Sequence, residues 1–296
     1  IALPDNGSAY INDADATGTT VSFGFENFVT PPSILWSDDD GVTLGHAQVQ
    51  PASFDPAQFV SEQLEVASKD GTMIPYFVVR PKELKGPVPT LLYGYGGFEV
   101  SMVPFYSQLI GELWLGKGNI YVLANIRGGG EFGPKWHQAA LKANRNKAYE
   151  DFAAVAKDLI ARKVTSTEHL GTLGGSNGGL LMGNMLTQYP ELFGAIVSQV
   201  PLLDMQRYHT LLAGASWMAE YGDPDDPTQW ATISKYSPYQ NVPDAARVKL
   251  EISPLTHSSG KRFSSAWRAR RLSAETLRIS SPEMAGRADS ADIGRF

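Results

Sequence analysis

The chain has 296 residues, of which 43% are hydrophobic and 19% are charged, and its formal net charge at pH 7 is −6. Such a composition is typical of a globular protein with a sizeable core, and the acidic balance argues against nucleic acid as a partner. The absence of cysteine excludes disulfides, thiolate metal sites and a cysteine nucleophile. Because no run approaches about 18 apolar residues, we expect no membrane-spanning segment.

The first 50 residues carry short strand-like runs between turns. These runs are residues 8–11 (SAYI), 20–25 (TVSFGF), 33–36 (SILW) and 42–48 (VTLGHAQ). A few short strands cannot form a closed core alone, so residues 1–50 are predicted to be the trailing edge of a β domain that lies upstream. The chain begins at Ile1 without an initiator methionine or a signal pattern, and we interpret it as a piece of a longer protein. Its oligomeric state and compartment stay open, with the cytoplasm slightly favoured.

Strand-like and helix-like segments alternate between residues 51 and 250. A hairpin is predicted from residues 62–67 and 73–80, around the turn 69–71 (KDG). Further strands are predicted at residues 90–93, 120–125, 169–173 and 195–200, and helices at residues 149–162 and 178–188. This alternation indicates an α/β domain with a mostly parallel sheet and helices on both faces. Glycine-rich loops follow three of the strands, at the edge where active sites gather in such sheets.

The pentapeptide 174–178 (GGSNG) has the pattern G-x-S-x-G and lies between a predicted strand and a predicted helix. In that context a serine on a sharp turn exposes its hydroxyl group, and the flanking glycines let the chain turn without a clash. Ser176 is therefore the candidate nucleophile. The alternative is a glycine-rich turn with a bystander serine.

An anionic intermediate on Ser176 would need hydrogen-bond donors. The backbone N–H of Asn177 is the expected first donor, because it follows the nucleophile at the start of a helix. The loop 93–98 (YGYGGF) follows an earlier strand and offers candidates for the second donor, among them the hydroxyl group of Tyr95. The residues alone leave open the alternative that these tyrosines only pack beside a flexible turn.

Four ordered segments carry a specific family resemblance. Residues 93–98 (YGYGGF), 125–133 (NIRGGGEFG), 174–179 (GGSNGG) and 199–205 (QVPLLDM) resemble the prolyl oligopeptidase family of serine peptidases in order and spacing. The likeness covers residues 61–248, and residues 1–50 resemble the end of the β-propeller that precedes the catalytic domain in this family. The resemblance implies an α/β-hydrolase fold, short peptides as substrates and no cofactor.

The resemblance also implies roles for individual residues. Ser176 would be the nucleophile, and the N–H of Asn177 and the hydroxyl group of Tyr95 would form the oxyanion site. Trp217 would stack on a substrate proline, in a pocket that is also lined by Phe98, Leu202 and Tyr221. A flat, apolar proline ring suits such an aromatic slot. Without the resemblance, Trp217 and Tyr221 would be interpreted as core residues.

The acid and the base of a catalytic triad are not recognised in the sequence. In α/β-hydrolases the acid and then the histidine follow the serine. His209 lies in the pocket-forming segment and is interpreted as structural, which leaves His257. That residue lacks the Gly-His context of the family, and Asp244 is too near it in sequence to be the acid, so a solvated surface histidine is its ordinary interpretation. An acid-bearing strand is not recognised after Val248.

The amino-acid composition of the chain changes near residue 250. Residues 251–296 form an atypical tail that is rich in Arg and Ser, with no apolar strand of useful length beyond residue 253, although residues 267–277 could form a basic amphipathic helix. This composition is typical of a shifted reading frame in a GC-rich gene. The alternative is a basic interaction segment.

No metal site is predicted, because Asp223, Asp225 and Asp226 alternate with prolines that favour a rigid turn over a calcium loop. Two functions follow from the sequence. One is a serine-type oligopeptidase that hydrolyses short peptides after proline through an acyl-enzyme on Ser176. The other is a catalytically impaired fragment that lacks the acid and histidine of the triad. The G-x-S-x-G pattern alone would also fit an esterase-type hydrolase.

Overall fold

The structure is a computed structural model that describes residues 6–16, 18–37, 45–84, 86–242, 249–253 and 277–279. The chain divides into two compact units. Unit 1 comprises Ile1–Gln63, Phe77–Lys85 and Val103–Tyr121, and unit 2 comprises Leu64–Tyr76, Gly86–Met102 and Val122–Phe296. The predicted domain borders at residues 50 and 250 stay a prediction.

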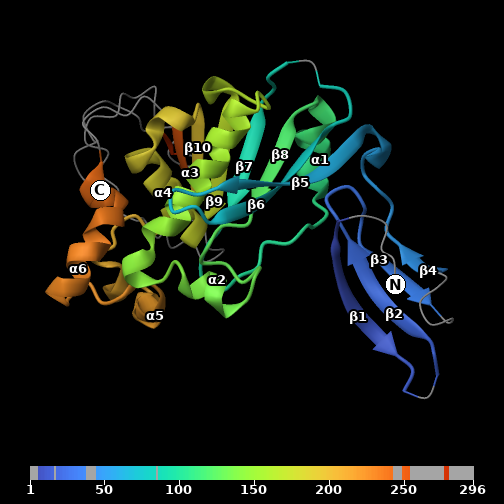
Figure 1. Ribbon diagram of the computed structural model, residues 1–296, viewed down its shortest axis with the longest axis horizontal. Coiled ribbons are helices and arrows are strands. Elements are labelled where there is room, and N and C mark those ends of the chain that lie inside the picture. The colour runs from blue at the N-terminus through green and yellow to red at the C-terminus, as the bar shows by residue number, and fades with distance from the viewer. Residues whose placement is uncertain are drawn as a thin grey trace. The chain divides into compact units, whose positions relative to one another are not determined.

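Unit 1 contains a four-stranded antiparallel sheet in the order β1-β2-β3-β4 (Figure 1). Its strands are β1 (Ser8–Ala14), β2 (Val21–Glu26), β3 (Ser33–Ser37) and β4 (Gly45–Val49). Phe23 and Phe25 lie two residues apart, on one face of β2, and are buried with Leu35 of β3, which pairs with Phe23. Each of the four strand-like runs predicted in the first 50 residues therefore overlaps a strand, and residues 42–44 of the last run lie outside the described residues.

A second sheet has eight strands in the order β12-β11-β10-β9-β7-β8-β6-β5. Its strands are β5 (Phe59–Ala67), β6 (Met73–Pro81), β7 (Thr90–Gly94), β8 (Ile120–Ala124), β9 (Leu170–Gly175), β10 (Ala195–Gln199), β11 (Lys249–Ser253) and β12 (Leu277–Ile279). The pairs β7–β9, β9–β10, β10–β11 and β11–β12 are parallel. β5 and β6 are neighbours, as the predicted hairpin requires. Parallel strands with helices between them confirm the predicted α/β class.

The α-helices are α1 (Gln108–Leu113), α2 (Pro134–Gln138), α3 (Asn146–Ala161), α4 (Asn177–Gln188), α5 (Met218–Tyr221) and α6 (Pro227–Ile233). α3 buries Phe152, Val155 and Leu159 at helical spacing, as its sequence pattern predicts. α4 packs on β9, β10 and α3 (Figure 1). Most of its residues are buried. Within the described ranges, no helix combines the length and apolarity needed to cross a membrane.

The sheet continues after Val248. Residues 249–253 form β11 and pair in parallel with β10, although the sequence shows no recognisable acid-bearing strand there. Residues 249–253 (KLEIS) alternate between polar and apolar side chains, which is a strand pattern, but the run is short and contains only two apolar residues. Most of the predicted helix at 267–277 lies outside the described residues. Leu277 itself begins β12.

The parallel pairing of β7 and β9 positions the candidate site. Tyr93 of β7 is opposite Leu173 of β9, so both strands reach their carboxyl ends at the same edge of the sheet. The glycine-rich loop after β7 and the serine-bearing turn after β9 consequently lie side by side.

Candidate active site

Ser176 occupies a sharp turn between β9 and α4. β9 ends at Gly175 and α4 begins at Asn177, and Ser176 itself adopts φ 56° and ψ −115°, a conformation that residues with side chains rarely adopt. Its backbone N–H donates to the carbonyl oxygen of Gln199 at 2.9 Å, and its carbonyl oxygen accepts from Leu180 in the first turn of α4. The residue is exposed. Backbone strain at an exposed nucleophilic side chain is a feature of active sites.

The glycines around Ser176 are required by the close approach of strand and helix. A Cβ atom on Gly174 would lie 2.4 Å from the carbonyl oxygen of Gly178. On Gly179, a Cβ atom would lie 2.8 Å from the carbonyl oxygen of Gln199. Because both obstacles are backbone atoms, any larger residue would force α4 away from the sheet. The packing therefore explains the glycines that the sequence pattern singled out.

Tyr95 follows β7 and has its side chain at the serine. Burial raises the pKa of the Tyr95 hydroxyl group above its ordinary value, while the side chain of Ser176 and the charge of Arg145 act in the opposite direction. The hydroxyl group therefore stays protonated at neutral pH and can donate a hydrogen bond. Asn177 is the first residue of α4, so its backbone N–H has no partner within the helix.

The loop after β7 is held in a strained conformation. Phe98 and Glu99 both have φ of 55°, in the left-handed region that residues with side chains avoid. The N–H of Phe98 donates to Oε1 of Glu220 at 3.0 Å. The side-chain amide of Asn177 donates to the carbonyl oxygen of Tyr95 at 2.7 Å. These bonds fix the loop at both ends of the segment 95–98.

Two of the four predicted pocket residues are in contact. The rings of Phe98 and Tyr221 meet edge to face, with 5.6 Å between their centroids. Tyr221 is buried, and its hydroxyl group donates to Oδ1 of Asn177 at 2.8 Å. Trp217 and Leu202 are partly exposed, and within the described residues neither has a ring contact or hydrogen bond with these groups. The structure thus brings together Ser176, Asn177, Tyr95, Phe98 and Tyr221. The roles of these five residues, and those of Trp217 and Leu202, stay predictions.

A buried ion pair beneath the site was missed by the sequence analysis. The side chain of Arg145 is 0% exposed, and its Nη1 donates to Oε1 of Glu220 at 2.8 Å. Its Nη2 donates to Oδ1 of Asn177. Its guanidinium also lies over the rings of Tyr221 and Tyr149, 5.3 Å and 5.9 Å from their centroids. In the sequence, Arg145 lies among polar residues and has the pattern of a solvated side chain, so no local signal identifies it.

Three histidines with described side chains have partners other than Ser176. Nε2 of His137 lies 2.8 Å from Oε2 of Glu220, and Nδ1 of His169 lies 2.8 Å from the hydroxyl group of Ser166. His209 pairs with Asp225. Within the described ranges, no histidine hydrogen-bonds to Ser176. His257, the one candidate base left by the sequence, lies outside the described residues.

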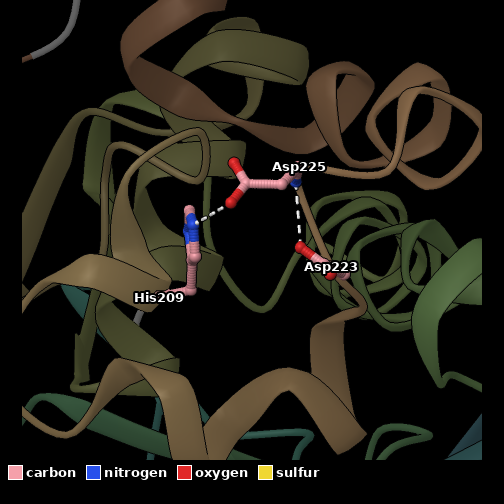
Figure 2. A group of neighbouring side chains, drawn as sticks. All are labelled: His209, Asp223 and Asp225. Carbon is pink, nitrogen blue, oxygen red and sulfur yellow. Dashed lines mark hydrogen bonds and ion pairs between the residues drawn. The ribbon is translucent and has the colours of Figure 1, made fainter.

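His209 contributes to a small cluster of ionisable side chains (Figure 2). Its Nε2 lies 3.0 Å from Oδ2 of Asp225, whose backbone N–H donates to Oδ1 of Asp223 at 2.9 Å. Asp226 caps α6 by accepting from the N–H of Thr228 at 2.8 Å. The three clustered side chains offer ligand atoms within 4.8 Å of one another, but Asp225 is 78% exposed and the histidine already has a carboxylate partner. These hydrogen bonds brace the turn at residues 223–226, and the structural interpretation of His209 and of this turn stays a prediction.

Comparison with known proteins places this geometry in a family. The sequence profile of the prolyl oligopeptidase family matches residues 107–251. An uncharacterized peptidase, y4nA, of Sinorhizobium fredii is 51% identical over 244 residues, which are 82% of this chain and 34% of that protein. The prolyl endopeptidase of Elizabethkingia meningoseptica is 39% identical over 248 residues, 82% of this chain and 35% of its own length. The chain belongs to the prolyl oligopeptidase family.

Solved structures of prolyl oligopeptidase family members have the same fold. One from an analysis of two prolyl endopeptidases has a TM-score of 0.84 at 37% identity, over 94% of this chain and 42% of that one. A post-proline cleaving enzyme from Rickettsia typhi has a TM-score of 0.78 at 42% identity, over 86% and 37%. Prolyl oligopeptidase B of Galerina marginata, bound to a 25-residue macrocyclization substrate, has a TM-score of 0.78 at 33% identity, over 83% and 35%. The predicted α/β-hydrolase fold is thus confirmed. This chain spans about a third of the length of the curated relatives.

Proposed function

We propose that this chain is the catalytic part of a serine peptidase that hydrolyses short peptides after proline, through an acyl-enzyme on Ser176. One observation carries the proposal: Ser176 lies exposed on a strained strand-to-helix turn after β9, beside the loop after β7 that carries Tyr95. The names of the relatives support peptide bonds as the substrate class.

The proposed reaction has two steps, the acylation of Ser176 and the hydrolysis of the resulting ester. The Oγ atom of Ser176 attacks the carbonyl carbon after proline, and a base accepts the proton of the hydroxyl group. The negative charge on the carbonyl oxygen is stabilised by the N–H of Asn177 and by the hydroxyl group of Tyr95. The C–N bond then breaks, the amine leaves with a proton, and water hydrolyses the ester on Ser176. No base is identified within the described ranges, and the sequence candidate outside them is His257, whose ordinary interpretation is a solvated surface histidine.

The pocket proposed for the proline ring combines Phe98, Tyr221, Trp217 and Leu202. The contact of Phe98 with the buried Tyr221 supports a rigid aromatic wall close to the nucleophile. Proline has no N–H and presents a flat apolar ring, so an aromatic wall binds it without leaving a polar group unpaired. Trp217 and Leu202, both partly exposed, would complete the pocket.

A second candidate is a catalytically impaired chain that retains the nucleophile and the oxyanion donors. The observation that favours it is that His137, His169 and His209 pair with other groups. In a protease that lacks a triad member, the oxyanion site and substrate binding leave a rate about a thousandfold above that in water. An esterase remains the alternative for an active chain, because the Ser176 turn alone does not distinguish ester from peptide substrates.

We also propose that residues 1–50 are the end of a β-propeller and residues 51–250 the peptidase domain. The four-stranded antiparallel sheet β1–β4 supports this division, because propeller blades are four-stranded sheets. The tail 251–296 is proposed to arise from a shifted reading frame. Translation of the other frames after the codon of Val248 tests this. A D-D-R turn that carries the acid of the triad, with a later Gly-His that carries its histidine, would support the proposal if both occur in one frame. Their absence from both frames would contradict it.

Matched substrates test the proposed activity. The chain is incubated with two peptides that differ only in Pro or Ala before the scissile bond, and with the corresponding proline ester. We expect cleavage after Pro at a rate about tenfold or more above Ala, since the aromatic wall is complementary to the ring. The Ser176→Ala variant controls for contaminating peptidases.

Each outcome selects one candidate. Ser176-dependent cleavage after Pro supports the peptidase. Turnover of the ester alone supports an esterase. An absence of turnover by a chain with native circular dichroism and a cooperative thermal transition supports the impaired chain and contradicts the proposed activity.

A further inference from the structure

Arg145 is an unusual residue for the place it occupies. It immediately precedes α3, where the N-terminal end of the helix dipole is unfavourable for a positive charge. Its side chain is fully buried, and withdrawal of a guanidinium from water is unfavourable unless its N–H groups have strong acceptors. A buried guanidinium of this kind lowers the free energy of unfolding unless its partners compensate, so these partners indicate its role.

The first partner is the side chain of Asn177. Arg145 and the hydroxyl group of Tyr221 both donate to Oδ1 of Asn177, and the amide nitrogen of Asn177 donates to the carbonyl oxygen of Tyr95. The side chain of Asn177 is therefore fixed at both of its polar ends. The backbone N–H of Asn177 is a proposed oxyanion donor. The guanidinium of Arg145 therefore restrains the residue that carries this donor, and it restrains the Tyr95 loop through the side chain of Asn177.

The second partner is Glu220 on α5. Its Oε1 accepts from Nη1 of Arg145 at 2.8 Å and from the backbone N–H of Phe98 at 3.0 Å. Phe98 is one of two successive residues in the left-handed conformation, and the surrounding structure must hold such residues in place. Glu220 thus fastens the strained part of the Tyr95 loop to the element that carries Tyr221.

His137 closes the cluster on its outer side. Its Nε2 lies 2.8 Å from Oε2 of Glu220, and its side chain is 18% exposed, whereas Glu220 is 4% exposed. Glu220 is therefore bracketed between Arg145 and His137, which satisfies both carboxylate oxygens. A carboxylate held by three groups from three segments has one orientation, which suits a positioning role.

We propose that Arg145 and Glu220 are positioning residues, which together hold Asn177, the Tyr95 loop and Phe98 in the geometry that stabilises the oxyanion and seats the substrate ring. This inference rests on the proposed function for its catalytic consequence. Neither residue touches the reacting atoms; both act through Asn177 and Phe98. The guanidinium fork is essential because it reaches Glu220 and Asn177 at once, and a lysine ammonium in its place offers no such fork.

Two variants test the proposal. Glu220→Gln removes the charge that holds Phe98 and Arg145, and Arg145→Lys retains the buried charge pair but loses the two-pronged contact. Hydrogen exchange is measured for peptides that cover residues 94–100 and 176–182, with residues 120–124 of β8 as the internal reference. The rate of Ser176 labelling by a fluorophosphonate is measured on the same samples.

We expect the amide of Phe98 to exchange about tenfold faster in Glu220→Gln, because its acceptor is weakened and the loop opens locally. Labelling of Ser176 should slow about tenfold or more in both variants, since a small displacement of the oxyanion donors is costly in rate. Exchange in β8 should not change. Glu62→Gln is the matched control, because Glu62 forms a two-pronged pair with Arg80 between β5 and β6, at 2.9 Å for each contact. It should alter neither readout.

Three results would overturn the inference. The first is unchanged hydrogen exchange at residues 94–100 in the variants. The second is a rate of Ser176 labelling in the variants that equals the rate in the parent. The third is faster exchange that includes β8 in both variants, which would indicate that the ion pair is purely structural. If the parent chain is not labelled at all, the proposed activity fails, and the exchange data alone still decide the positioning role.

Discussion

At the scale of single residues, the hydroxyl group of Tyr95 is the most specific element of the proposed mechanism. Tyr95 lies in the loop beside the Ser176 turn, and burial keeps the pKa of its hydroxyl group above the ordinary value of a tyrosine. We predict that Tyr95→Phe lowers the rate of acylation about 10²- to 10³-fold, the usual effect of removing one oxyanion donor, with little change in KM. Because the pKa is raised, the parent should keep this donor up to at least about pH 10.

The control for that prediction is Tyr93→Phe. Tyr93 is two residues away in β7, and its pKa is also raised by burial, but its ring has no assigned role. Steady-state kinetics and fluorophosphonate labelling should be unaffected by this change. Equal rates for Tyr95→Phe and the parent would show that the second donor lies elsewhere.

Gly97 offers a second test at the same scale. A Cβ atom there would lie 2.5 Å from the side-chain nitrogen of Asn177 and 2.9 Å from the guanidinium of Arg145. We predict that Gly97→Ala slows labelling of Ser176 about tenfold or more, because it displaces the group that fixes the oxyanion donor. Gly171→Ala in β9 is the matched control, since its Cβ would meet its nearest atoms at an ordinary 3.8 Å. Similar rates in the two variants would contradict the proposed rigidity.

At the scale of elements, the turn between β5 and β6 is stabilised by a second buried arginine. Arg127 bonds Asp151 with its Nε and Nη2 atoms and reaches Asp70 of the turn with Nη1. The hydrogen bond from Arg127 holds the pKa of the Asp70 carboxyl group well below its usual range, against the opposing effect of burial. The folded state therefore favours the ionised carboxylate.

This pairing predicts a pH-dependent stability. A lowered folded-state pKa contributes stability above the ordinary aspartate pKa of about 4, and that contribution is lost as the pH falls below it. Asp70 is 37% exposed, so Asp70→Asn should lower the free energy of unfolding by only about 1 kcal/mol at neutral pH. The difference in the free energy of unfolding between the parent and Asp70→Asn, measured by urea unfolding, should become smaller as the pH falls toward about 3. A difference that stays constant over this range would show that the charge is not responsible.

Local sequence patterns determine most of these elements. The helix predicted at 149–162 is α3 (Asn146–Ala161), and the strand predicted at 120–125 is β8 (Ile120–Ala124). Both are long or apolar enough for periodicity to identify them. β11 (Lys249–Ser253) is harder to identify because it is short and contains only two apolar residues, and it pairs with β10 and β12.

At the scale of the whole molecule, the candidate site divides into a part that the sequence predicts and a part that it does not. Ser176, Asn177 and Tyr95 follow from short motifs whose glycines leave a local signal. Arg145 and Glu220 are 75 residues apart and meet only through the fold. No periodicity or motif marks either one, because the pairing depends on long-range packing of η3 (Lys142–Asn144) against α5.

The central claim is that Ser176 is an activated nucleophile. It is tested most directly by reaction of the chain with a fluorophosphonate probe, followed by peptide mapping in a mass spectrometer and comparison with Ser176→Ala. The account predicts one modified site, Ser176, with labelling abolished in the alanine variant and strongly reduced in Tyr95→Phe. A folded chain that is not labelled, or labelling that persists in Ser176→Ala, would contradict it.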